Sequence, residues 1–338
     1  MAYKIGNRTI GFDKKPQIIS YASVVGKKEH QGPLSEEFDV FTEDSLFGEE
    51  SFEKAESKLQ KTAVEKALEK AGLRTTDIDK IFAGDLLNQC IGSSFGIRDM
   101  GIPFIGLYGA CSTMALSLGI ASIFVDSGAA QRAIAVTSSH FCSAERQYRF
   151  PLNYGSQRTP TAQWTVTGSG AVVLGNDDNE GNGIYVNQVC FGEIEDYGIT
   201  DANNMGAAMA PATASTIKHY FEDTNTAPED YDIIYTGDLG RVGTKLLYEL
   251  CEDQGIDIRC RHSDCGTLIF DCDKQDVHAG GSGCGCSASV LCSYIMHRLE
   301  EGKFGNILFI STGALMSPTS SFQGESIPGI AHLVNIRK

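Results

Sequence analysis

The chain has few basic residues for its length. It contains 28 Lys and Arg but 43 Asp and Glu among 338 residues, so its formal net charge is −15. A surface this acidic repels nucleic-acid phosphates and anionic lipid. The composition therefore argues against nucleic acid as a partner.

Long apolar runs are also missing. The longest, Met114–Val125, is shorter than the roughly 20 residues that a membrane span needs. The first residues, Met1–Arg8, contain no apolar core of the kind found in signal peptides. We therefore expect an intracellular protein without a signal peptide or transmembrane segment, soluble or at most peripheral to a membrane.

Cysteine is abundant, but its pattern is not that of a disulfide framework or a zinc site. The count is odd, at 11, and no Cys-x-x-Cys pair occurs. Mostly free, buried thiols in a reducing compartment are the simplest interpretation. We expect no metal site and no cofactor.

The most informative pattern is an internal repeat. The segment Asp79–Leu86 recurs as Asp232–Leu239, with five of eight positions identical. Each copy has the pattern of a short apolar strand that ends in a Gly-Asp turn. A helical pattern precedes each copy, over Ser51–Ala71 in the first half and roughly Ala214–Glu222 in the second.

The repeat continues downstream. An apolar helix is predicted over Cys111–Asp126 and is followed by the strand Ala133–Thr137; a second is predicted over Cys284–Glu301 and is followed by Ile307–Ser311. Helices that are apolar on all sides must be buried on all sides. Continuously apolar strands belong to sheets that are covered on both faces.

Together these patterns predict an α/β fold, a duplicated five-layer α-β-α-β-α sandwich. The expected halves are residues 1–175 and 176–338, divided at the polar stretch Asn176–Asn182. The alternative is two unrelated α/β units whose similarity is due to chance.

Cys111 is the leading candidate for a chemical role. It lies between the predicted strand Phe104–Leu107 and the buried helix. The positive end of a helix favours a thiolate, and free backbone amides there can bind an oxyanion or a carboxylate. The alternative is a small buried residue that fills the top of the helix.

A nucleophilic cysteine also needs a base, and the repeat indicates where one would lie. The matching tips in the second half are Tyr235–Arg241, Ala279–Ala288 and Ser311–Ser317, and none contains His. His278 lies next to the second tip, and His140 follows a strand whose end could line a crevice. Each histidine could equally be structural.

Several motifs resemble the thiolase superfamily, including its type III ketoacyl synthases. The segment Ala63–Leu73 is similar to the superfamily's first helix, Gly109–Cys111 to its nucleophile turn, and Thr167–Leu174 to one of its strands. The resemblance covers nearly the whole chain. It implies the thiolase-like fold and a homodimer.

Within the superfamily, the chain is similar to a family of sporulation proteins. The segments Gly11–Asp13, Phe47–Glu49 and Ser156–Thr161 and the Cys-rich second half carry this likeness. It implies binding of dipicolinic acid, alone or as its calcium chelate, and uptake of that acid into the developing spore. It also implies membrane proteins of the same sporulation operon as partners, and a location in the forespore or spore, peripheral to the spore inner membrane.

The chain departs from the superfamily at the residues that assist the nucleophilic cysteine in catalysis. Ser282 stands where the superfamily has a catalytic His or Asn, and Gly237 lies where the other His of type III synthases falls. The closing thiolase motif falls on Ser311–Leu315, without its cysteine. Loss of a positioned base costs about 100- to 10,000-fold in rate.

The expected function is therefore binding of dipicolinate by a catalytically retired protein, with no catalytic residue. The expected ligand-binding residues come from both halves: Cys111, Asn88, His140, His278 and Ser282. The main alternative is an acyltransferase or condensing enzyme that uses Cys111. A third possibility is an assembly protein with a vestigial crevice, whose surface docks a membrane transporter.

Overall fold

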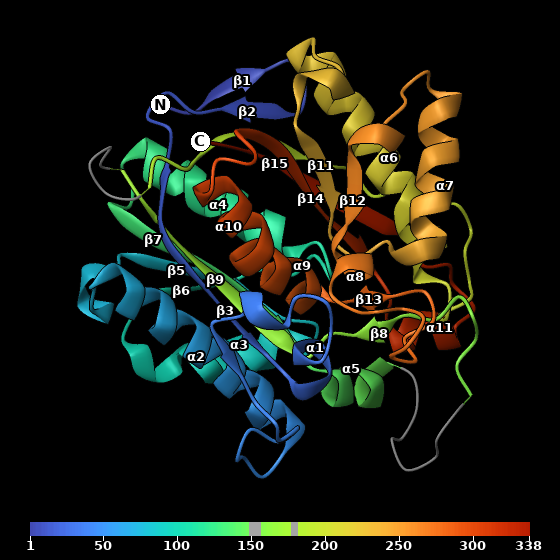
Figure 1. The fold of residues 1–338 in the computed structure, drawn as a ribbon, viewed down its shortest axis with the longest axis horizontal. Coiled ribbons are helices and arrows are strands. Elements are labelled where there is room, and N and C mark those ends of the chain that lie inside the picture. Colours follow the sequence, from blue (N-terminus) through green and yellow to red (C-terminus); the bar gives the residue numbers. More distant parts are fainter. Residues whose placement is uncertain (149–156, 177–181) are drawn as a thin grey trace.

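The computed structural model describes residues 1–148, 157–176 and 182–338. Thirteen of the strands in these residues form one mixed sheet, and its main strands make two halves with the same strand order (Figure 1). The first half runs β3 (Gln17–Val25), β9 (Gly168–Gly175), β7 (Arg132–Ser139), β5 (Lys80–Gly84) and β6 (Phe104–Gly106). The second runs β10 (Tyr185–Phe191), β15 (Gly329–Arg337), β14 (Asn306–Ala314), β11 (Ile233–Thr236) and β12 (His262–Asp264).

The pairing directions of the two halves also match. In each half the three outermost strands pair in parallel, as in β6–β5–β7 and β12–β11–β14, and the remaining neighbours are antiparallel. The halves meet where Tyr185 of β10 pairs with Gln17 of β3. This equivalence confirms the predicted duplication, including the repeated strands β5 and β11.

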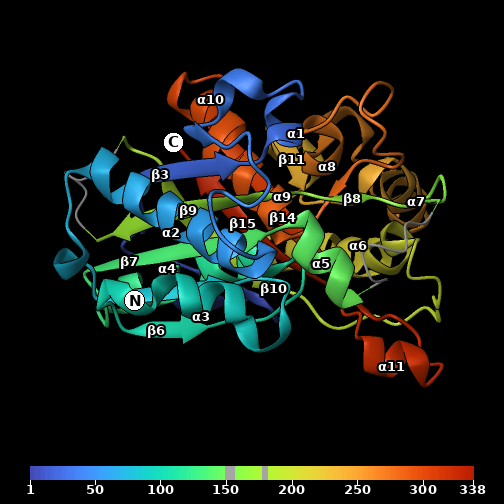
Figure 2. The same cartoon turned by 90° about the horizontal axis from the view of Figure 1, so that it is seen from below.

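Helices complete five layers. On the outside, α2 (Phe52–Ala71) and α3 (Ile91–Ile97) cover the first half-sheet, and α6 (Met205–Thr224) and α7 (Gly240–Asp253) lie together over the second (Figures 1 and 2). Between the half-sheets, α4 (Thr113–Ser127) contacts strands of both, and it packs on α9 (Cys284–Val290). The thiolase-like sandwich is therefore the observed fold.

The first outer helix follows its sequence signals closely. The side chain of Ser51 accepts a hydrogen bond from the N–H of Lys54 at the start of α2, and Gly72 ends the helix at φ 66°. Leu59 and Ala63 on its apolar stripe are fully buried against the sheet. Both boundaries agree with the prediction to within one residue.

The other predicted helices needed correction. Helix α4 begins at Thr113, two residues later than expected, because Ser112 is its cap. The single helix expected over Cys284–Glu301 is interrupted after α9 by a π-helical turn, Leu291–Ile295, and resumes as α10 (Met296–Glu300). Helix α6 starts at Met205 and continues through Pro211, because burial of its first turns outweighs the proline.

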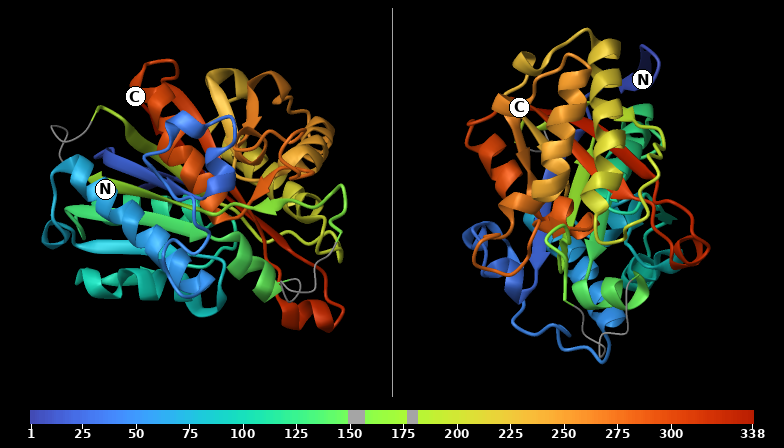
Figure 3. Two further views of the ribbon diagram at one scale, coloured as in Figure 1. Left: turned by 60° about the horizontal axis from the view of Figure 1, so that its bottom comes forward. Right: turned by 90° about the vertical axis from the view of Figure 1, so that its right-hand side faces the viewer.

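One segment of the described chain, Ala110–Ser127, is long and apolar enough to resemble a membrane span, but 72% of it is buried inside the protein. Its apolar composition is accounted for by the place of α4 between strands of both half-sheets (Figure 1). The outer helices lie on opposite sides of the molecule, with α2 in blue and α6 and α7 in yellow and orange (Figure 3). The proposed division of the chain at residues 175 and 176 stays a prediction, because it adjoins residues 177–181, which lie outside the described ranges.

Smaller elements surround this frame. They are β1 (Tyr3–Ile5), β2 (Thr9–Gly11), α1 (Lys27–His30), β4 (Val40–Phe41), α5 (Phe141–Tyr148), β8 (Trp164–Thr165), α8 (Cys265–Leu268), β13 (Gly281–Ser282) and α11 (Pro318–Phe322). The short parallel pair β8–β13 sets Thr165 beside Ser282. That pairing brings two distant segments to one cavity.

Candidate functional site

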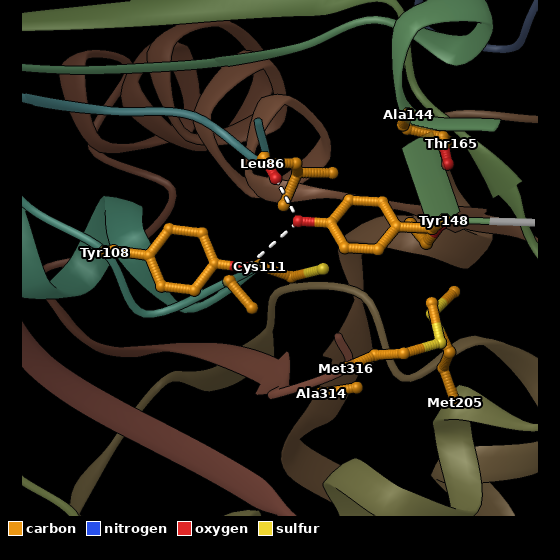
Figure 4. A pocket seen from close by; sticks show the side chains of 11 residues that line it. Leu86, Tyr108, Cys111, Ala144, Tyr148, Thr165, Met205, Ala314 and Met316 are labelled. Atoms are coloured by element: carbon orange, nitrogen blue, oxygen red, sulfur yellow. Dashed lines mark hydrogen bonds between the residues drawn. The ribbon is translucent and has the colours of Figure 1, made fainter. Parts of the chain in front are cut away.

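A cavity lies where the tips of the two repeats meet (Figure 4). The cavity has a volume of about 410 Å³ when its open mouth is included. The centre of a water molecule can occupy only about 30 Å³ of it, because side chains fill most of the interior. Most of the lining is apolar. The residues around it are Leu86, Tyr108, Ala110, Cys111, Ala144, Tyr148, Thr165, Met205, Ser282, Ala314 and Met316.

The turn that carries Cys111 is held rigidly. Ala110 has φ 50°, a left-handed conformation that is unusual for a residue with a side chain and that often marks functional sites. The hydroxyl of Ser112 donates to the carbonyl of Gly109 at 2.6 Å, and the hydroxyl of Thr113 donates to the carbonyl of Ala110 at 2.6 Å. These bonds hold the thiol against the cavity.

The environment of the Cys111 thiol differs from the one expected. Burial, and then the nearby Asp238 carboxylate, raise the pKa of this thiol well above its usual value. The N–H groups of Gly283 and Ala314 act in the opposite direction, but burial prevails. The expected stabilisation of a thiolate by the helix terminus was therefore wrong.

The sequence analysis predicts that the backbone amides after Cys111 bind a carboxylate. In the structure they are not free to do so. The N–H of Ser112 donates to the carbonyl of Gly109 at 3.0 Å, and that of Thr113 donates to the carbonyl of Ala110 at 3.3 Å. The backbone donors that face the sulfur come instead from the second half of the chain, at Gly283 and Ala314.

Asp238 is the residue that the sequence analysis missed. Its carboxylate is fully buried, accepts hydrogen bonds from the Thr312 hydroxyl at 2.6 Å and from the Gly283 N–H at 2.8 Å, and raises the pKa of the Cys111 thiol. Burial raises its pKa to about 7. The signal was present, because Asp238 belongs to the repeated Gly-Asp turn.

The repeat places the matching aspartate, Asp85, in an equivalent setting. Its carboxylate accepts hydrogen bonds from the N–H and hydroxyl of Ser93 at 2.7 and 2.6 Å, and burial raises its pKa. Its charge helps to raise the pKa of the buried thiol of Cys284, the counterpart of Cys111. That thiol donates its hydrogen bond to the carbonyl of Ser138 at 2.9 Å, so the two repeats differ in the partner of the cysteine.

Ser282 has the clearest mark of a binding residue. Its side chain is only 1% exposed, it lines the cavity, and its hydroxyl has no hydrogen-bond partner among residues 1–148, 157–176 and 182–338. Buried polar groups are nearly always satisfied, so an orphan needs an explanation. A ligand in the cavity would supply the missing partner.

Two tyrosines stand at the mouth of the cavity. The hydroxyls of Tyr108 and Tyr148 lie 3.1 Å apart, and Tyr148 also donates to the carbonyl of Leu86 (Figure 4). Tyr108 is 46% exposed. An aromatic pair therefore separates the thiol from solvent.

The structure brings together only two of the five predicted binding residues, Cys111 and Ser282. Asn88 is exposed on the turn after β5, where its N–H donates to Oε1 of Gln147 at 3.0 Å. His278 is partly exposed, and its Nε2 lies 3.2 Å from a carboxylate oxygen of Asp276. Neither lines the cavity.

His140 is also elsewhere. It is buried, its Nε2 lies 2.7 Å from the carbonyl oxygen of Ser45, and its ring packs against Phe52. It lines a separate surface hollow that also includes Lys28 and Trp164. In the described part of the chain, no group of three or more His, Cys, Asp or Glu residues is arranged to hold a metal ion.

Comparison with known proteins identifies the family. The family model described as stage V sporulation protein AD matches residues 6–337. Stage V sporulation protein AD of Bacillus subtilis strain 168 is 45% identical over 327 residues, which cover 97% of this chain and 96% of that protein. The chain belongs to the stage V sporulation protein AD family. This membership indicates a role in sporulation.

Solved structures with the same fold are type III synthases and related proteins. The 3-oxoacyl-(acyl carrier protein) synthase III of Xanthomonas oryzae pv. oryzae matches with a TM-score of 0.61 and 12% identity over the whole of both chains. Cerulenin-bound OleA of Xanthomonas campestris matches with a TM-score of 0.60 and 14% identity, over 97% of this chain and 98% of its own. At such identities the likeness establishes the fold alone.

Proposed function

We propose that this protein binds dipicolinate in the cavity between Cys111 and Ser282 and serves dipicolinate uptake into the developing spore without catalytic turnover. The observation that carries the proposal is the buried, unpartnered hydroxyl of Ser282 at the cavity wall. Family membership supports the sporulation role.

The chemistry of the lining suits a planar aromatic acid. The apolar side chains of Met205, Met316 and Tyr148 can pack on a ring, and methionine adapts readily to a ligand's shape. The Ser282 hydroxyl and the N–H of Ala314 can donate to a carboxylate. The free space is small, so entry of the ligand requires these side chains to move.

Charge distinguishes the two forms of the ligand. Among the residues that the structure describes, no Lys, Arg or His lines the cavity. The 1:1 calcium chelate is neutral and needs no cation. From the described lining, the free dianion receives hydrogen-bond donors, and its binding also depends on the state of the Asp238 carboxyl.

A second candidate function is acyl transfer or condensation by Cys111. One observation favours it: the charge of the buried Asp238 acts on the thiol, and this carboxyl has a pKa of about 7, in the range of a general base. Against it stand the raised pKa of Cys111 and the serine and glycine at the superfamily's base positions. Turnover of acyl-CoA that disappears in Cys111→Ala would establish this alternative.

The partners and location follow the same proposal. We infer that the protein acts with membrane proteins of its sporulation operon, at the spore inner membrane, as a homodimer. Strand β6 ends the sheet with an open edge, and Phe104 on it is 39% exposed. Light scattering at tens of micromolar should give twice the chain's mass, and a monomer's mass would contradict the dimer.

Calorimetric titration tests the function directly. Purified protein should bind dipicolinate, with and without calcium, and should not bind acyl-CoA. Ser282→Trp fills the cavity and should abolish binding; overpacking costs about 1–3 kcal/mol, so a cooperative melting transition at a lower temperature shows that the variant still folds. Ser321→Trp, at an exposed position on the segment after β14, is the matched control and should bind normally. Unchanged affinity in Ser282→Trp would place the ligand elsewhere.

A further inference from the structure

Asp238 lies beside the proposed ligand site, because its carboxylate accepts a hydrogen bond at 2.8 Å from the N–H of Gly283, the residue next to Ser282. Asp238 is 0% exposed, and its second donor is the Thr312 hydroxyl at 2.6 Å. Both donors are uncharged. Within the described part of the chain, the carboxylate therefore has hydrogen bonds but no countercharge.

The titratable groups that act on Asp238 are acids and thiols. Asp264, the last residue of β12, raises the pKa of Asp238. The thiols of Cys111, Cys265, Cys284 and Cys286 also interact with its charge. In the described part of the chain, none of these groups carries a positive charge that would offset a second negative one.

A carboxylate ligand near Cys111 and Ser282 would bring that second charge. Two negative charges in a desolvated site repel each other strongly, and the usual outcome is that one of them takes up a proton. The Cys111 thiol is already protonated at neutral pH, since its pKa is raised. Asp238 is the group that remains to accept the proton.

We propose that Asp238 is a positioning residue that takes up a proton when the cavity binds an anionic carboxylate, so that ligand affinity depends on pH. This rests on the proposed dipicolinate site and deepens it. Once protonated, the Asp238 carboxyl is neutral and no longer repels the ligand through Cys111.

The pH dependence has a definite sign. Free Asp238 titrates at about pH 7, and a bound anion raises that value. Below about pH 6 the group is already protonated, so affinity is constant. Above about pH 7 each bound ligand brings a proton, and affinity falls up to about tenfold per pH unit.

The experiment is calorimetric titration of the wild-type protein with calcium-free dipicolinate in buffers of different ionisation enthalpy. Proton uptake should rise from near zero at about pH 6 to close to one per ligand at about pH 8. No binding at any pH would overturn the proposed function. Binding without proton uptake at about pH 8 would overturn this inference alone.

Variants identify the group that takes up the proton. Asp238→Asn should bind dipicolinate without proton uptake and with pH-independent affinity. Thr312→Val removes a hydrogen bond that lowers the Asp238 pKa, so the fall in affinity should begin at a higher pH. Glu29→Gln is the matched control, because Glu29 is a buried acid of similar pKa, about 7, bonded to the N–H of Thr167, and it should retain proton uptake. An unchanged pH profile in both Asp238→Asn and Thr312→Val would overturn the assignment.

Discussion

The carboxylate of Asp238 and the thiol of Cys111 belong to different repeats of the chain, and the charge of the carboxylate raises the pKa of the thiol. The matching residues of the other repeat are arranged differently, because the Cys284 thiol donates to the carbonyl of Ser138 at 2.9 Å and Asp85 accepts from the hydroxyl of Ser93 at 2.6 Å. The cavity takes Cys111 from the first half of the chain and Ser282 from the second. Neither half can therefore build the cavity alone.

The raised pKa of Cys111 predicts low reactivity. Only the thiolate attacks alkylating agents, so Cys111 should react with iodoacetamide at neutral pH at least about tenfold more slowly than exposed Cys260. Mass spectrometry of the labelled peptides measures both rates in one sample. Faster labelling of Cys111 would mean that the site holds a thiolate and would favour the enzyme alternative.

Removal of the Ser282 hydroxyl should separate binding from stability. Because this hydroxyl has no partner, Ser282→Ala should leave the free energy of unfolding unchanged or slightly higher. Dipicolinate affinity should fall by about 1 kcal/mol, the value of one hydrogen bond. Ser293→Ala is the control, since that hydroxyl donates to the carbonyl of Ser289 at 2.6 Å; it should lose stability and keep affinity. The reverse result would assign Ser282 a structural role.

The close approach of β14 to the cysteine turn should make Gly313 intolerant of a side chain. A Cβ there would lie 2.5 Å from the carbonyl oxygen of Gly109 and 3.0 Å from the nitrogen of Ser112. Gly313→Ala should therefore cost about 1–3 kcal/mol in urea unfolding and displace Cys111. Gly305→Ala, whose nearest neighbour would be 3.9 Å away, should be close to neutral. Equal stabilities would show that the turn can shift freely.

The buried Glu29 predicts a pH dependence of stability. Its pKa is about 7 in the folded protein against 4.5 for the free side chain, because burial disfavours the charged form. Its contribution is full below about pH 4.5 and is lost as the pH rises through about 7, a change of up to roughly 3 kcal/mol. Urea unfolding between these pH values should therefore show a shallower decline for Glu29→Gln than for the wild-type protein. Parallel declines would mean that Glu29 is ionised throughout this range.

Sequence motifs identified some of the cavity residues and missed the role of others. Cys111 and Ser282 were identified because each lies in a recognisable turn at the start of an inner helix. Asp238 is part of the repeated Gly-Asp turn, so its position could be predicted from the sequence. Its role depends on its interaction with the Cys111 thiol. Because Cys111 lies in the other repeat, the sequence around Asp238 does not reveal that interaction. His140 shows the converse case, since a strand-end position did not reveal that its ring turns toward Ser45 and Phe52.

The sequence by itself determined the duplicated architecture, because apolar periodicity, helix caps and a repeated strand motif are local patterns. They can be recognised without knowing which residues are in contact. It also determined the position of Cys111. Only the tertiary structure decided the protonation state of that thiol, its interaction with the Asp238 carboxylate and the position of Ser282 in the same cavity. Burial and charge at a site depend on atoms supplied by both repeats, and the distance between those atoms is a property of the packed layers rather than of any segment.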